Sequence, residues 1–329
     1  MIKIAVDVMG MDKGSVVAVE AIKHFLEMYK DVSFVVFGKK EELVQLEGKC
    51  EIIDSREVMG MEDGALAILR KKETSMIKAV DYAKTHDDVD AVISGGSTGA
   101  FLTASTIYLK LIEGIERAAL LSPFPTVKDK NVIVLDIGAN SDNTPAHLLE
   151  FAKMGRVFSK VYNDLENPDI YLLSNGAEEK KGSELVKAAH QLIKESGLEG
   201  FKGNIEARYA LSGDADVIVA GGFDGNILLK GIEGTAKAMS GMLKVGFKKN
   251  IFTMIGYLLA RSGVNYVRDK LDYKKYGGAM LVGVNKLVVK AHGSSDEIAF
   301  FSALKVCYEL VKKDIVAKMK EEMKWWKSC

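Results

Sequence analysis

Six short apolar runs in this sequence each end in glycine beside a polar side chain, near residues 10, 95, 138, 176, 222 and 293. A buried strand followed by a glycine turn and a helix is the repeating element of a sheet whose strands run parallel. In open sheets of this kind, ligands bind at the carboxyl ends of the strands. We therefore expect the six loops to form one shared rim that holds a polar, phosphorylated ligand.

The alternation of apolar and helical segments predicts a single α/β domain, residues 1–329, with a mainly parallel sheet and helices on both faces. The expected strands are 2–8, 33–37, 51–53, 90–94, 117–121, 131–136, 169–173, 216–220 and 287–290. The expected helices are 16–29, 40–46, 62–72, 75–85, 145–161, 184–196, 235–248, 256–271 and 296–322. No apolar run reaches the roughly 20 residues that span a bilayer, and the first residues are expected to form a strand rather than a signal peptide.

Composition argues against several kinds of site. The 45 basic residues balance 45 acidic ones, so nothing global favours nucleic acid, and anions must be bound by local groups. The cysteines, Cys50, Cys307 and Cys329, are scattered, and no cluster of cysteine and histidine has the spacing of a zinc site. We expect no metal, no structural disulfide and a reducing cytoplasm.

The stretch 90–100 is the strongest single indication of a ligand site. A buried strand breaks into glycines and is followed by small residues with helical spacing, and the candidate binding residues are Gly95, Gly96, Ser97, Thr98 and Gly99. This geometry offers unpaired backbone N–H groups to an anion. The alternative is a tight turn with an ordinary serine N-cap. The stretch matches neither G-x-G-x-x-G nor a Walker P-loop, so a dinucleotide is disfavoured.

Polar residues in the other loops complete the predicted site. The candidates for substrate or phosphate binding there are Asp7, Gly10, Asp136, Asn140, Gly176, Gly225, Gly293 and Ser294. His292 lies between a strand and a glycine, so its side chain can reach the rim, whereas the other histidines fall in predicted helices or at their ends. Ser294 and Ser295 lack the G-x-S-x-G pattern of a nucleophile, so helix capping is favoured. Lys181 either belongs to a solvated charge run or points at the site.

Eight segments occur in a recognisable order along the chain. They are VDVMGMD at 6–12, SGGSTGA at 94–100, LDIGAN at 135–140, NGAEEKKG at 175–182, GNIE at 203–206, GFDGN at 222–226, YGGA at 276–279 and HGSSD at 292–296. This series resembles the PlsX family of acyl-acyl-carrier-protein:phosphate acyltransferases over nearly the whole chain. Met11 stands where that family has a second glycine, and no proline follows shortly after. The resemblance implies a Rossmann-like fold similar to isopropylmalate dehydrogenase.

The resemblance also implies a reaction, in which a long-chain acyl group moves from acyl-carrier protein to inorganic phosphate and gives acyl phosphate for phospholipid synthesis. Phosphate is already an anionic nucleophile, so no Ser-His-Asp triad is needed. The protein must position the reactants and stabilise an oxyanion, for which Lys181 and Asn226 are suited, with His292 assisting. No cofactor is expected.

Two other functions remain open at this point. One is an enzyme like phosphate acetyltransferase that uses acyl-coenzyme A, and the other is a membrane-associated scaffold that senses a ligand. If the carrier protein is the donor, its acidic surface is expected to dock on a local basic patch, for which Arg70, Lys71 and Lys72 are candidates. A downstream glycerol-3-phosphate acyltransferase is a further expected partner.

Residues 232–272 are expected to form a projecting pair of amphipathic helices that joins two copies as a homodimer. The apolar stripes are Ile232, Ala236, Met239, Leu243 and Phe247 on the first helix, and Tyr257, Ala260, Val264, Val267 and Leu271 on the second. Between them lies the apolar tip 251–259, including Ile251, Phe252, Ile255 and Leu258, with Lys244, Lys248, Lys249 and Arg261 on either side. We expect this tip to contact the surface of a membrane, which makes the protein cytoplasmic and peripherally membrane-associated. The alternative is that the tip completes the dimer core.

Overall fold

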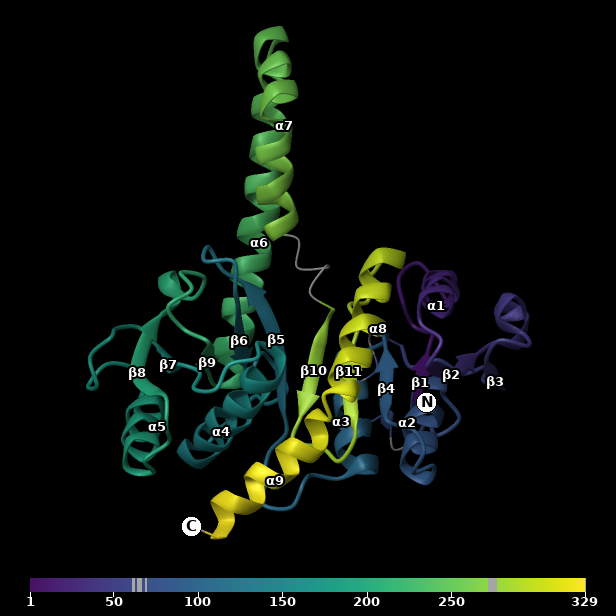
Figure 1. The fold of residues 1–329 in the computed structure, drawn as a ribbon, viewed down its shortest axis with the longest axis horizontal. Coiled ribbons are helices and arrows are strands. Elements are labelled where there is room, and N and C mark those ends of the chain that lie inside the picture. Colours follow the sequence, from purple (N-terminus) through teal and green to yellow (C-terminus); the bar gives the residue numbers. More distant parts are fainter. Residues whose placement is uncertain (61–62, 64–66, 69, 272–276, 329) are drawn as a thin grey trace.

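The computed structural model describes residues 1–60, 63, 67–68, 70–271 and 277–328. Within these residues a sheet of 11 strands runs in the order β3-β2-β1-β4-β11-β10-β5-β6-β9-β7-β8. The strands are β1 (Ile2–Asp7), β2 (Val32–Gly38), β3 (Glu51–Asp54), β4 (Ala91–Ser94), β5 (Ala119–Pro125), β6 (Asn131–Leu135), β7 (Ile170–Ser174), β8 (Phe201–Glu206), β9 (Val217–Val219), β10 (Ala279–Val282) and β11 (Leu287–Lys290). The strands join the two sides of the molecule into one continuous layer (Figure 1).

The helices are α1 (Val16–Met28), α2 (Ser75–Thr85), α3 (Thr98–Leu109), α4 (Pro145–Tyr162), α5 (Glu184–Glu195), α6 (Gly222–Phe247), α7 (Ile251–Leu271), α8 (Glu297–Lys312) and α9 (Ile315–Ser328). Helices α1, α4, α5, α8 and α9 bury their apolar sides in one core cluster on one face of the sheet. Helices α2, α3 and α6 pack into a second cluster on the opposite face. The prediction of helices on both faces of a mainly parallel sheet is therefore confirmed.

The strands run in opposite directions in the two halves of the sheet. Strands β1, β2, β3, β4 and β11 are parallel to one another, and so are β6, β9, β7 and β8. Between these groups, β10 is antiparallel to both β11 and β5, and β5 is antiparallel to β6. The two groups therefore run in opposite directions. The register nevertheless carries Ser94 and Lys290, the ends of β4 and β11, to Ala279, which is one residue from the row Met280, Leu121 and Leu135 that contains the end of β6. The carboxyl ends of the central strands thus meet near the middle of the sheet.

Several predicted elements differ from the structure. Residues 40–46 form two short 3-10 turns, η1 (Lys40–Glu42) and η2 (Val44–Leu46), rather than a helix. The strand predicted to end at residue 121 continues to Pro125, because its prolines lie in antiparallel pairing with β6. Strands β8 and β10 were not predicted at all. Of the helix predicted over 62–72, residues 62, 64–66 and 69 lie outside the described residues, and the others, 63, 67–68 and 70–72, are not α-helical.

Three helix boundaries also differ between the prediction and the structure. Helix α6 begins at Gly222, so the GFDGN motif forms its first turn instead of a loop. Helix α7 begins at Ile251, because the Asn250 side chain accepts a hydrogen bond from Thr253 N at 2.9 Å and Thr253 Oγ1 accepts one from Asn250 N at 3.1 Å. The last helix is broken after Lys312, where Asp314 has a positive φ of 54°.

Helices α6 and α7 form the predicted hairpin, which projects far beyond the rest of the molecule (Figure 1). Its predicted end, residue 272, lies outside the described residues. At the base, Ile232 packs against the core of the domain and Ala236 is buried, so part of the predicted stripe contacts the chain's own core. Among the helices that the structure describes, none is long and apolar enough to cross a membrane.

Candidate active site

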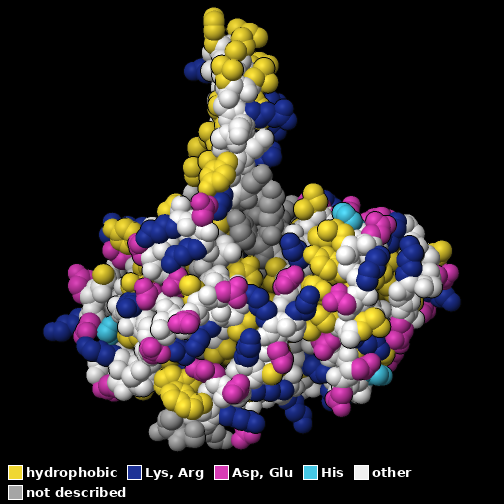
Figure 2. Space-filling model, viewed as in Figure 1, with side chains coloured by type: hydrophobic (Ala, Val, Ile, Leu, Met, Phe, Trp, Pro, Cys, Tyr) yellow, Lys and Arg dark blue, Asp and Glu magenta, His cyan; other side chains and the backbone are white. Residues whose placement is uncertain are grey.

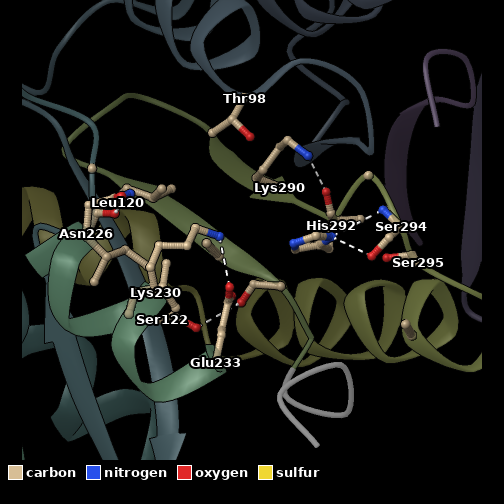
Figure 3. Close-up of a pocket in the computed structure, with 18 of the residues that line it drawn as sticks. Thr98, Leu120, Ser122, Asn226, Lys230, Glu233, Lys290, His292, Ser294 and Ser295 are labelled. Atoms are coloured by element: carbon tan, nitrogen blue, oxygen red, sulfur yellow. Dashed lines mark hydrogen bonds and ion pairs between the residues drawn. The ribbon is translucent and has the colours of Figure 1, made fainter. Parts of the chain in front are cut away.

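A cavity of about 570 Å³ lies on the sheet face that carries α3 and α6. Its floor is formed by β5, β10 and β11, the central strands where the two halves of the sheet meet. Five of the six predicted glycine loops reach it, contributing Asp12, Gly96, Gly138, Asn226 and His292 among others. Figure 3 shows Thr98, Lys290, His292 and Ser294 on one side and Asn226, Lys230 and Glu233 on the other. Five of the six predicted loops thus share one cavity where the two half-sheets meet, and the loop near residue 176 does not line it.

The amino end of α3 presents uncapped backbone donors to this cavity. Thr98 and Gly99 line the cavity, and the side chain of Ser97 makes no capping hydrogen bond. The first N–H groups of a helix have no partner within the helix, so they attract an anion, and the helix dipole adds to this attraction. Ser97 occupies the N-cap position, as the alternative interpretation proposed, yet it leaves those donors available.

The turn before α3 is held by Asp7, which lies beneath the cavity rather than in its wall. Ser94 Oγ donates to Asp7 Oδ2 at 2.7 Å and accepts from Gly96 N at 3.1 Å. Burial raises the pKa of the Asp7 carboxyl, against the hydrogen bonds that favour its charged form. Gly10 has a positive φ of 78°, and a Cβ added there would stand 3.2 Å from the Cα of Gly96. These two residues therefore support the turn before α3 and do not line the cavity.

Lys290 is the residue that the sequence analysis missed. It ends β11, is only 6% exposed and lines the cavity. Its ammonium donates to the carbonyl of Ala291. Burial lowers the pKa of Lys290 to about 8, although the carboxylates of Asp7 and Asp12 oppose that shift. A lysine at the carboxyl end of an otherwise apolar strand, next to a glycine loop, was the signal available in the sequence.

His292 and Ser294 form a second polar pair in the wall. His292 Nδ1 accepts from Ser294 N at 3.2 Å and lies 2.9 Å from Ser294 Oγ. Because Nδ1 is an acceptor, the neutral ring carries its proton on Nε2. Burial lowers the pKa of His292, which favours that neutral form. The cap of α8 is Asp296, which accepts from Ala299 N at 3.0 Å, so the predicted capping role of Ser294 and Ser295 is wrong.

The loop after β6 is organised around the buried carboxylate of Asp136. It accepts hydrogen bonds from backbone N–H groups of Leu120, Gly138, Ala139 and Asn140, and from the Asn140 side chain. Burial raises the pKa of Asp136, whereas these donors act in the opposite direction. With its oxygens fully engaged, Asp136 supports the loop and does not line the cavity.

Asn226 is held against this loop by the first turn of α6. Its Nδ2 donates to the carbonyl of Ile137 at 3.0 Å, and the side chain lines the cavity. The preceding residue, Gly225, packs so closely that an added Cβ would lie 1.9 Å from the carbonyl oxygen of Asp136. Only glycine allows this approach. The amide of Asn226 retains one N–H for a ligand in the cavity.

Three of the remaining predicted residues lie away from the cavity. Lys181 is exposed on the segment after β7, and its side chain packs over Gly176 instead of toward Asn226. Strand β7 is parallel to β6 and β9, but it lies beyond β9 in the sheet and so farther from the central strands that form the floor of the cavity. Gly95 packs behind the site against Met11, whose Cγ lies 2.5 Å from an added Cβ. The structure therefore does not bring Lys181 or Gly176 together with the residues of the cavity.

The rest of the wall is apolar along one side. Leu120, Pro123, Phe124, Pro125, Leu229 and Ala279 form it. Lys230 and Glu233 pair with each other on α6, at a distance of 2.9 Å between Lys230 Nζ and Glu233 Oε2. An anion site beside an apolar wall suits a ligand that has both a charged end and a hydrocarbon chain. Among the described residues, no group of acidic, cysteine and histidine side chains could hold a metal ion.

Comparison of the sequence with known protein families and with individual proteins identifies the family of this chain. Residues 2–318 match the model of a family described as fatty acid synthesis protein. A phosphate acyltransferase from Macrococcus caseolyticus (strain JCSC5402) is 38% identical over 324 residues, which cover 98% of this chain and 99% of the relative.

Solved structures of more distant proteins share the fold. The EutD phosphotransacetylase from Staphylococcus aureus aligns with a TM-score of 0.57 at 16% identity, covering 97% of this chain and 94% of that one. A 4-hydroxythreonine-4-phosphate dehydrogenase from Burkholderia phymatum aligns with a TM-score of 0.50 at 15% identity, covering 94% and 98% of the two chains. At such low identity these likenesses confirm the predicted fold and nothing more.

Proposed function

Since this chain belongs to the phosphate acyltransferase (PlsX) family and is therefore an acyltransferase that uses phosphate, we propose that its donor is a long-chain thioester of acyl-carrier protein. The observation that carries the proposal is the cavity, in which the uncapped amino end of α3 and Lys290 adjoin an apolar wall. One substrate of the reaction is a small anion and the other carries an alkyl chain, and the cavity offers a complementary surface to each.

In the proposed mechanism, phosphate binds at the N–H groups of Thr98 and Gly99 with the ammonium of Lys290 as its counter-ion. A phosphate oxygen attacks the thioester carbon, and a C–O bond forms as the carbonyl becomes an oxyanion. The second N–H of Asn226 stabilises that oxyanion. The C–S bond then breaks, the Nε2–H of His292 donates a hydrogen bond that stabilises the leaving thiolate, and the thiolate takes its proton from solvent. The products are acyl phosphate and the free thiol of the donor.

Turnover of defined thioesters tests this proposal. Purified protein should consume palmitoyl-carrier protein only when phosphate is present, and acyl phosphate should accumulate. If acetyl-coenzyme A is consumed instead, the protein acts like the phosphotransacetylases that share its fold. A protein that turns over neither thioester would refute the proposal and leave the scaffold hypothesis.

The carrier protein's docking site is a separate proposal. Arg70 and Lys72 are exposed, whereas Lys71 pairs with Asp63 at 2.6 Å between Nζ and Oδ2. Reversal of all three basic charges should raise the KM for acyl-carrier protein. The increase should be largest at low salt, because dissolved ions screen the attraction between exposed charges. An unchanged KM would place the docking patch elsewhere.

We also propose that the hairpin joins two copies and rests its tip on a membrane, next to which an amphiphilic product can be released. The tip exposes apolar side chains, with Phe252 80% and Leu259 86% accessible. Figure 2 shows this apolar end above lysine and arginine side chains on the stem. A groove of about 630 Å³ between α6 and α7, lined by Leu243, Phe247 and Tyr257 among others, is available to a second copy.

The double variant Ile255→Asp, Leu258→Asp separates the two roles of the hairpin. It should abolish co-sedimentation with anionic liposomes and leave both the dimer and turnover of soluble acyl-carrier protein intact. Dissociation into monomers would show that the tip belongs to the dimer core instead. Retained liposome binding would show that the tip is not the membrane contact.

A further inference from the structure

A second groove adjoins the cavity at a junction that we call the waist. It encloses about 350 Å³ and lies between α3 and the loop that follows β6. Gly99 and Gly138 line both the cavity and this groove. Asn226 stands at the same waist, because a Cβ added to Gly138 would lie 2.6 Å from its Nδ2. A substrate whose reacting carbon sits beside Asn226 therefore has space on both sides of that carbon.

The lining of the groove alternates apolar and polar groups. Leu102, Ile107, Leu111 and Leu281 supply the apolar surface. Thr103 Oγ1 donates to the carbonyl of Gly99 at 2.8 Å and Thr106 Oγ1 donates to that of Leu102 at 2.9 Å. Each hydroxyl has used its single proton and faces a ligand as an acceptor. An alkyl chain in this groove would remove water from these acceptors without replacing its hydrogen bonds, at a cost in binding free energy.

The outer end of the groove carries a cation. Arg117 is exposed there, and the part of the chain that the structure describes offers it no ion-pair partner. The neighbouring Glu116 directs its carboxylate toward His147, at 3.7 Å between Oε2 and Nε2. Asn140, also in the lining, gives both N–H groups to Ala118 and Asp136, so its oxygen remains an acceptor. The groove thus has acceptors along its length and a guanidinium at its mouth.

We propose that this groove binds the phosphopantetheine arm of the acyl donor, with Arg117 at the phosphodiester and the threonine hydroxyls at the amide N–H groups. This inference rests on the proposed function, because only a thioester donor presents such an arm. The arm is amphipathic, carries two amides and ends in a phosphodiester, which matches the order of groups in the groove. The acyl chain then extends from the waist along the apolar wall of the first cavity.

Three palmitoyl thioesters test the assignment, because they share the acyl chain and differ in the arm. They are the carrier-protein thioester, the coenzyme A thioester and the N-acetylcysteamine thioester, which lacks most of the arm. In Arg117→Ala, the ratio of kcat/KM for palmitoyl-carrier protein to that for the N-acetylcysteamine thioester should fall about tenfold. Arg208→Ala, the same change at an exposed arginine outside both the groove and the proposed docking patch, is the matched control and should leave that ratio unchanged. The coenzyme A thioester carries the same arm without the carrier protein. If Arg117 contacts the arm itself, the ratio of kcat/KM for palmitoyl-coenzyme A to that for the N-acetylcysteamine thioester should fall in Arg117→Ala as well.

A second variant tests the groove by filling it. Thr103→Phe should lower kcat/KM for both full-length arms and leave the preference for palmitoyl over octanoyl N-acetylcysteamine thioesters unchanged. A changed chain-length preference would show that the alkyl chain occupies the groove and would overturn the proposal. Equal losses with all three thioesters, or no loss in Arg117→Ala, would also overturn it. If the unaltered protein turns over none of the thioesters with phosphate, the proposed function itself has failed.

Discussion

Replacement of Gly225 by alanine is expected to displace Asn226 and so to affect both folding and catalysis. The added Cβ would lie 1.9 Å from the Asp136 carbonyl oxygen, 2.9 Å from its carbon and 3.3 Å from the Cα of Ile137. All three neighbours are backbone atoms, so no side chain can rotate away. Since Cβ contacts under 3.0 Å are essentially never observed, α6 and the Asp136 loop must separate by about 1 Å.

The size of the effect follows from this shift. Overpacking of this kind costs about 1–3 kcal/mol of unfolding free energy. A displacement of about 1 Å at a catalytic group can cost roughly 100-fold in rate. We therefore expect Gly225→Ala to unfold at lower urea concentration and to lose about 100-fold in kcat/KM for the acyl donor.

Gly231 provides a control within the same helix. It is exposed, and a Cβ added there would meet nothing within 4 Å. Gly231→Ala should therefore stabilise α6 by about 0.5–1 kcal/mol and leave the rate unchanged. Urea denaturation followed by circular dichroism and steady-state kinetics measure both quantities. If Gly225→Ala unfolds like the unaltered protein and retains its kcat/KM, the close approach does not position Asn226 and the reasoning is refuted.

Three further predictions concern Lys290, Asn226 and Lys181. The pKa of Lys290 is about 8, so its ammonium is present below that pH, and kcat/KM for phosphate should decline as pH rises above about 8. Lys290→Met should raise the KM for phosphate by about 10- to 100-fold and remove this decline, and a variant that keeps the decline would exclude Lys290 as its cause. Asn226→Ala should fold normally and lose about 10²–10³ in kcat, the usual cost of one oxyanion donor, so a near-normal rate would remove it from the mechanism. Lys181→Ala should retain the normal rate because Lys181 does not line the cavity, and a large loss would restore the role that the sequence predicted for it.

Local pattern was enough to predict many elements and several site residues. The helix 75–85 and the strand 287–290 have the predicted bounds, because their periodicity and flanking residues are unambiguous. Strands β8 and β10 were not predicted, because glycines at 203 and 277–278 are typical of loops. The break after Lys312 was missed because apolar spacing continues across it, and Asp314 in a left-handed conformation is not a pattern that periodicity detects.

The site was harder to predict because it depends on the order of strands in the sheet. Sequence shows where a strand ends but not which strands lie beside it. Lys181 and Asn226 both follow strand ends, yet Asn226 follows β9, which lies next to β6, whereas Lys181 follows β7, one strand farther from the centre, and does not line the cavity. In the sequence, Lys290 is only the last residue of an apolar strand. Its place in the lining of the cavity, close to the carboxylates of Asp7 and Asp12, is visible only in the structure.

The order of strands has a consequence for synthesis of the chain. Strands β4 and β5 are consecutive in the sequence, but β10 and β11, which lie within residues 279–290, separate them in the sheet. The two halves emerge from the ribosome first, each with one edge that has no pairing partner until the last strands insert between them. Such open edges are where chains aggregate, and this late, long-range closure is intrinsically slow. Because Lys290 and His292 line the cavity and arrive with that closure, a nascent chain that stops before it lacks this cavity.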